Sequence, residues 1–146
     1  MPPQRMDARM TARWTRLSEA ARTVGLGPTL TADIAQNFTP AFRASGATAP
    51  WESLLRARRL EGYLGCAAAI AGTDFYTTTA NLRLPCLVIA SDQDAITPAD
   101  MLRELAELTP GARFGVIRRS GHLPMMEQPQ AFATALTHFS RSIGQL

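Results

Sequence analysis

The sequence predicts an α/β chain whose first part is helical and whose last part alternates strands with helices. Apolar residues recur at helical spacing from Trp14 to about Ala71, and no strand pattern interrupts them. From Leu82 onward, apolar runs rich in branched residues alternate with amphipathic segments. The 146 residues, 46% of them hydrophobic, have the length of one domain and can form a real core.

Glycine and proline divide the helical part. Gly25 and Gly27 with Pro28 separate the first helix from the second, and Pro50 is well placed to begin a helix that carries Trp51. Packing is the expected role of Trp51 and Tyr63. The predicted apolar faces are Trp14, Leu17, Ala21 and Val24; then Leu30, Ile34 and Phe38; then Leu60, Tyr63, Leu64, Ala67 and Ile70.

The last part has the order strand, helix, strand, helix. The run "LPCLVIA" predicts a strand buried on both faces, and "ARFGVIRR" predicts a second short strand. Between them, "TPADMLRELAEL" predicts a helix with Thr97 as its N-cap and Pro98 in its first turn. The closing helix is predicted from "QPQAFATALTHFSRSI". Its expected buried side is Phe132, Leu136, Phe139 and Ile143, with His138 left in solvent.

A strand followed by a crossover helix and another strand predicts parallel pairing. Parallel sheets are generally larger than two strands and are covered on both faces, so a two-stranded one has no evident way to bury its second face and its edges. The sequence therefore indicates part of a larger sheet.

Composition narrows the function classes. The net charge is only +3, and all fifteen basic side chains are scattered arginines, so nucleic acid is not an expected partner. Two separated histidines and no C-x-x-C give no plausible metal site. Cys66 and Cys86 are expected to be free and buried. No run reaches the roughly 20 apolar residues of a membrane span. A soluble, cytoplasmic protein is the expectation.

The loops that leave the two strands carry residues suited to proton transfer. The first strand runs into "SDQDAITP", which holds Asp92 and Asp94, and the second runs into "SGHLP", which holds His122. Open α/β sheets bind their ligands at the carboxyl ends of the strands, where both loops should lie. A carboxylate beside an imidazole fixes the ring tautomer and stabilises the imidazolium. Taken alone, His122 can also be an ordinary loop histidine.

These segments resemble a known family. The stretch "CLVIASDQDAITP…GARFGVIRRSGHLPMMEQPQAF" resembles the last two strands of an α/β-hydrolase, with its acid loop and its Gly-His loop. The stretches "GYLGCAAAIAGTDF" and "FTPAFR" are similar to the cap region of 3-oxoadipate enol-lactonases, which hydrolyse an enol-lactone ring in aromatic degradation. The resemblance extends from about Trp14 to Phe139.

The resemblance implies roles for individual residues. Asp94 corresponds to the acid of the catalytic triad and His122 to its base. Asp92 is then a turn residue whose side chain bonds to local backbone N–H groups. Trp14 resembles an aromatic residue that lines the substrate cavity. Hydrolysis of this kind needs no cofactor.

The resemblance also implies a serine on a G-x-S-x-G turn, with an oxyanion hole beside it, before the cap. Neither is present in the 146 residues. We therefore expect the C-terminal half of a hydrolase: residues 1–80 as the helical cap and residues 81–146 as the C-terminal α/β-hydrolase segment, with the nucleophile-bearing N-terminal half absent. The intact enzyme would hydrolyse a carboxylic ester or lactone, and this chain alone would be nearly inactive.

Other interpretations stay open at this point. The partner that completes the sheet could be an N-terminal half or a second copy of the chain. A non-catalytic binding or assembly protein derived from a hydrolase is one alternative. Another capped hydrolase, such as an esterase, epoxide hydrolase or dehalogenase, is a second, because acid and histidine loops do not separate these enzymes.

Overall fold

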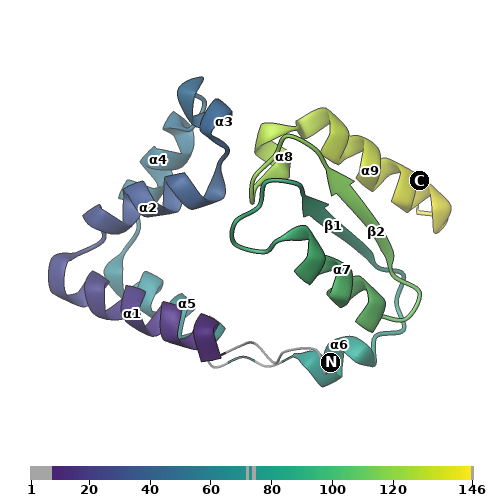
Figure 1. Cartoon of the computed structure of the whole chain (residues 1–146), viewed down its shortest axis with the longest axis horizontal. Coiled ribbons are helices and arrows are strands. Elements are labelled where there is room, and N and C mark those ends of the chain that lie inside the picture. The colour runs from purple at the N-terminus through teal and green to yellow at the C-terminus, as the bar shows by residue number, and fades with distance from the viewer. Residues whose placement is uncertain (1–7, 72, 74, 146) are drawn as a thin grey trace.

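The computed structural model describes residues 8–71, 73 and 75–145 (Figure 1). Residues 1–7, 72 and 74, which belong to the predicted cap region, lie outside the described residues. Figure 1 shows one group of helices, α1 to α5, beside a second group that contains the strands. No helix within the described ranges is long and apolar enough to cross a membrane.

The first group is helical, as predicted. Glycines mark the break between its first two helices, because α1 ends before Gly25, which has a φ of +76°, and α2 begins at Gly27. Pro50 lies in the first turn of α4. The helices are α1 (Ala8–Val24), α2 (Gly27–Asn37), α3 (Pro40–Ala44), α4 (Ala49–Arg56) and α5 (Leu60–Ala71).

The second group has the predicted order of strands and helices, with short helices added. After α6 (Tyr76–Ala80) come β1 (Leu87–Ser91), α7 (Ala99–Leu108), β2 (Arg113–Ile117), α8 (Pro124–Glu127) and α9 (Pro129–Ser142). The strands are parallel, as predicted, and their register runs from Leu87 opposite Arg113 to Ser91 opposite Ile117. Figure 1 shows the two strands lying between α7 and α9. Both strands therefore end at the same edge of the sheet.

The predicted N-cap of α7 is wrong. The helix begins at Ala99, and Pro98 occupies the cap position without any side-chain cap hydrogen bond. The Thr97 hydroxyl instead donates to a carboxylate oxygen of Asp94, at 2.7 Å. A cap bond worth about 1 kcal/mol is thus replaced by a bond to the adjoining loop.

Burial in this chain is shallow. The fully or nearly fully buried apolar residues are mostly small, and the apolar β1 residues Leu87, Val88 and Ile89 are only partly buried. Several apolar residues predicted to be covered are exposed, among them Val24, Met101 and Leu136. Cys66 is also exposed, which corrects its predicted burial. The strands therefore keep apolar surface that these elements alone do not cover.

The tightest helix pairing joins α1 and α5, and it depends on small side chains. Ala21 of α1 is 0% exposed and Ala67 of α5 is 1% exposed, so neither helix leaves room for a larger residue at these positions.

We predict that Ala67→Leu destabilises the chain by about 1–3 kcal/mol, because the added carbons must push α5 away from α1. The neighbouring exposed Ala68 provides the control, and Ala68→Leu should change the free energy of unfolding by less than about 0.5 kcal/mol. Urea unfolding followed by circular dichroism measures both values. Equal stability of the two variants would contradict the proposed packing.

Candidate active site

The shared edge of the sheet brings an acid and a histidine together. Asp94 lies in the loop after β1 and His122 in the loop after β2, 28 residues apart in sequence. The Nδ1 atom of His122 lies 2.9 Å from Oδ2 of Asp94. The Asp94 side chain is 4% exposed, whereas that of His122 is 31% exposed. The carboxylate is thus enclosed, and the imidazole remains accessible.

The environment of Asp94 favours its ionised form. Burial alone would raise the pKa of Asp94, but several hydrogen bonds outweigh burial and lower that pKa below its usual value. The donors are the His122 ring, the Thr97 hydroxyl, and the backbone N–H groups of Thr97 and Ile96. Asp94 is therefore a charged acceptor at neutral pH.

The charge on Asp94 fixes the tautomer of His122. An ionised carboxylate can only accept, so Nδ1 of the neutral imidazole carries the proton and donates it toward Asp94. The other ring nitrogen, Nε2, is then left with a free lone pair. An imidazole in this state can take a proton from a hydroxyl group and later return it.

The backbone turns sharply at Arg119, three residues before His122. Arg119 has a φ of +57°, the left-handed conformation that glycine usually provides, and its carbonyl accepts a bond from the Gln128 side chain. Gly121 is needed for a different reason. A Cβ at this position would lie 2.8 Å from the Asn37 carbonyl oxygen and 2.9 Å from Oε1 of Glu127.

Asp92 ties the two loops together. Its Oδ1 accepts a hydrogen bond from the backbone N–H of Ser120, at 3.3 Å, so the predicted bonding to local backbone is wrong. Asp94 makes the local bonds instead. Beneath the loops, the buried hydroxyls of Ser91 and Ser120 lie 3.2 Å apart. The backbone that carries His122 is therefore fixed to the backbone that carries Asp94.

The helical part is bonded to the same loop. The backbone N–H of His122 donates to the carbonyl of Asn37, the last residue of α2, at 2.9 Å. Glu127 of α8 accepts from the backbone N–H of Gly121 and from Thr39, which precedes α3. No sequence signal indicated Glu127 or Thr39, because 88 residues separate them.

An aromatic group lies beside these bonds. Phe38, which is 3% exposed, stacks on Phe42 with ring centroids 5.2 Å apart and meets Trp51 edge-on at 6.2 Å. Trp51 thus packs as predicted. The Trp51 Nε1 and the Tyr63 hydroxyl are buried and have no hydrogen-bond partner among the described residues. Burial, with Asp33 nearby, raises the pKa of Tyr63.

Trp14, the residue predicted to line the substrate cavity, lies in the helical part of the chain. It belongs to α1, whose main contacts are with α5 and α2, and its ring lies under the guanidinium of Arg13 at 5.6 Å. Its side chain is partly buried. The structure joins Asp94 to His122 but gives no hydrogen bond or ring contact between Trp14 and either of them.

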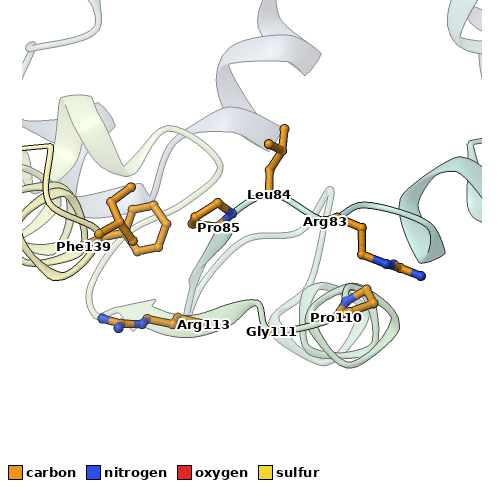
Figure 2. A pocket seen from close by; sticks show the side chains of 8 residues that line it. Arg83, Leu84, Pro85, Pro110, Gly111, Arg113 and Phe139 are labelled. Carbon is orange, nitrogen blue, oxygen red and sulfur yellow. The ribbon is translucent and has the colours of Figure 1, made fainter.

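A shallow hollow of about 350 Å³ lies at the other end of the strands (Figure 2). Pro85 and Arg113, which stand at the amino ends of β1 and β2, line it together with Phe139. Asp94 and His122 do not contribute to this hollow. Within the described residues, no group of three His, Cys, Asp or Glu side chains could hold a metal ion.

The parallel strands and the acid and histidine loops at one sheet edge match a known fold. The model of the α/β-hydrolase fold family matches residues 10–129, so the chain belongs to that family.

Among curated relatives, the chain is 31% identical over 126 residues to 3-oxoadipate enol-lactonase 2 of Acinetobacter baylyi, an alignment that covers 84% of this chain and 46% of the relative. It is 38% identical over 63 residues to the non-heme bromoperoxidase BpoC of Mycobacterium tuberculosis, covering 43% of this chain and 24% of that protein.

Solved structures of hydrolases also resemble the chain. A hydrolase from Pseudomonas aeruginosa superposes with a TM-score of 0.82 at 30% identity, covering 88% of this chain and 49% of that one. The enol-lactonase of Burkholderia xenovorans gives 0.78 at 25% identity, covering 86% and 49%. A thermophilic esterase from Thermogutta terrifontis gives 0.86 at 24% identity, covering 97% and 53%, and shows the fold alone. The chain spans about half the length of these proteins or less.

Asp94 should contribute stability that disappears in acid. Because its pKa is lowered in the folded chain, this contribution is fully present above the ordinary value of 3.8 and is lost as pH falls through the lowered value. We predict that Asp94→Asn flattens this part of the stability profile. Urea unfolding from about pH 6 to about pH 2 measures it. Exposed Asp100 is the control, and a profile equally changed by Asp100→Asn would contradict the assignment.

Gly121→Ala should destabilise the chain by about 1–3 kcal/mol, because the new Cβ meets backbone and carboxylate oxygens below 3.0 Å. Gly65 is a matched control, since a Cβ there meets nothing within 4 Å and the site is inside α5. Gly65→Ala should raise stability by about 0.5–1 kcal/mol. Thermal unfolding of both variants checks the prediction, which fails if Gly121→Ala is neutral.

Proposed function

We propose that this chain supplies the acid and the general base of a carboxylic ester or lactone hydrolase. The observation that carries the proposal is the 2.9 Å contact between Nδ1 of His122 and Oδ2 of Asp94 at the carboxyl ends of adjacent parallel strands. The similarity to 3-oxoadipate enol-lactonase 2 favours a lactone or ester as the substrate.

In the proposed reaction, His122 removes the proton of a nucleophilic hydroxyl through Nε2. The hydroxyl oxygen attacks the carbonyl carbon of the substrate, and the imidazolium then gives its proton to the leaving oxygen. Asp94 holds the ring and stabilises the imidazolium. Water repeats the sequence on the acyl-enzyme, which releases the acid and restores the hydroxyl.

In the proposed enzyme, the nucleophile and the oxyanion hole come from outside these 146 residues. The 146 residues contain no G-x-S-x-G, and the chain covers about half of the enzymes it resembles. We propose that an N-terminal half of the hydrolase fold completes the sheet at the free edge of β1. In that assembly, residues 1–80 act as the cap over the substrate and Trp14 lines its cavity.

Exposed apolar surface supports such a completion. Leu84, just before β1, is 69% exposed, and Met101 of α7 is 48% exposed. Three successive β1 residues are also only partly buried. A larger sheet would cover these groups, with a gain of about 25 cal/mol for each Å² of apolar surface removed from water.

The same surface could pair with a second copy of the chain, which would favour an assembly role without catalysis. Size-exclusion chromatography with light scattering separates the two cases. A stable symmetric dimer that blocks addition of an N-terminal half supports assembly, whereas a monomer that binds this half supports the hydrolase proposal.

The chain alone should not hydrolyse p-nitrophenyl acetate faster than its His122→Ala variant, because the nucleophile and the oxyanion donors supply most of the rate enhancement. His138→Ala is the control for background catalysis by an exposed histidine. Hydrolysis by the chain alone that His122→Ala abolishes would contradict the prediction.

A fusion tests the positive side of the proposal. Joining the chain to the N-terminal portion of the Acinetobacter baylyi enol-lactonase that it does not match, provided that this portion contains G-x-S-x-G, should restore ester or lactone hydrolysis. His122→Ala should then lower kcat by roughly 10⁶-fold. A folded, active fusion that is indifferent to His122→Ala would overturn the assigned roles.

A further inference from the structure

A carboxylate outside the acid–histidine pair connects the His122 loop to the helical part. Oε1 of Glu127, in α8, accepts the backbone N–H of Gly121 at 2.8 Å. The same oxygen lies 3.2 Å from the backbone N of Thr39, and Oε2 accepts the Thr39 hydroxyl. The Glu127 carboxylate thus accepts hydrogen bonds from Gly121 and Thr39, which are 82 residues apart in sequence (121 − 39 = 82).

These bonds act on the backbone that immediately precedes the imidazole. Gly121 is buried and adjoins His122, whose own N–H is held by the Asn37 carbonyl at 2.9 Å. Thr39 is buried as well, and its hydroxyl oxygen caps α3 by accepting the N–H of Phe42. Every donor to Glu127 is therefore itself fixed by packing or by another hydrogen bond.

The fit around Glu127 is close. A Cβ added at Gly121 would come within 2.9 Å of Oε1, so the carboxylate lies directly against the backbone and leaves no room for water between them. Charge-assisted bonds of this kind to backbone N–H groups are short and roughly twice as strong as neutral ones. The position of Gly121 is thereby determined by Glu127.

We infer that Glu127 is a positioning residue that holds the His122 imidazole against Asp94 and links its placement to the α2–α3 junction of the helical part. Glu127 does not touch the ring and acts only through Gly121 and Thr39. The inference deepens the proposed function and rests on it for its catalytic meaning, whereas the geometry it concerns can be measured on the chain by itself.

NMR of the 146-residue chain tests the inference without any substrate. In Glu127→Ala, the ¹⁵N signals of His122 should shift from the Nδ1–H form toward the mixture of tautomers found in a free imidazole. The pKa of Asp94 should rise toward its ordinary value of 3.8, because the His122 bond that lowers it is weakened. The signals of exposed His138 should not move.

Two further variants separate positioning from general destabilisation. Glu107→Ala removes an exposed carboxylate from α7 and should leave His122 and Asp94 unchanged. Glu127→Gln keeps an acceptor oxygen for the backbone N–H groups of Gly121 and Thr39 but loses the negative charge and the acceptor for the Thr39 hydroxyl, so it should produce the same changes to a smaller extent. It replaces the alanine variant if that variant does not fold. A folded Glu127 variant with unchanged His122 tautomer and Asp94 pKa overturns the inference.

The kinetics of the fusion protein, once it hydrolyses esters or lactones, give an independent test. Glu127→Gln should lower kcat by about 10- to 100-fold, as expected for a misplaced catalytic group, and leave KM within about twofold. If the wild-type fusion does not hydrolyse esters or lactones, the proposed function fails while the NMR result still decides the role of Glu127. If hydrolysis is restored and the NMR signals do not respond, only the positioning role fails.

Discussion

Parallel pairing of β1 with β2 is the constraint on which the candidate site depends. Because the strands run in the same direction, Ser91 pairs with Ile117, and the loops that follow leave the sheet at one edge. An antiparallel pair would have placed the two loops at opposite ends. Asp94 and His122 are 28 residues apart in sequence, yet Oδ2 of Asp94 lies 2.9 Å from Nδ1 of His122. The crossover helix α7 makes this possible, since parallel strands cannot be joined by a tight turn.

The two loops that carry Asp94 and His122 depart from local conformational preferences at two residues, Thr97 and Arg119. Thr97 stands where the sequence indicates an N-cap, yet its hydroxyl donates to Asp94. Arg119 adopts a left-handed conformation that an arginine rarely takes, just before the segment that carries His122. Departures of this kind from local preference are expected where a structure positions functional groups, because tertiary hydrogen bonds there outweigh local propensity.

The sequence was sufficient for the order of the strands and helices, for parallel pairing, and for the meeting of Asp94 with His122, because apolar periodicity and strand ends are local signals. The bonds from Glu127 to Thr39 and Gly121 could not be foreseen, since 88 residues separate Glu127 from Thr39 and neither residue type signals such a contact. Exposure was mispredicted at Cys66 and Val24 because periodicity shows which side chains share a face and not what covers that face.

The sheet is only partly covered, whereas the Asp94–His122 pair is fully formed, and the difference follows from the range of the interactions involved. The described elements bury the first three residues of β1 only in part, whereas the hydrogen bonds that fix Asp94 and His122 all come from within the described residues. Directional bonds over short distances can form inside a half of a fold, but burial of a sheet needs a second layer. A partner that completes the sheet would therefore meet Asp94 and His122 already oriented, and in the proposed hydrolase it would add the nucleophile and the oxyanion donors along with cover for β1.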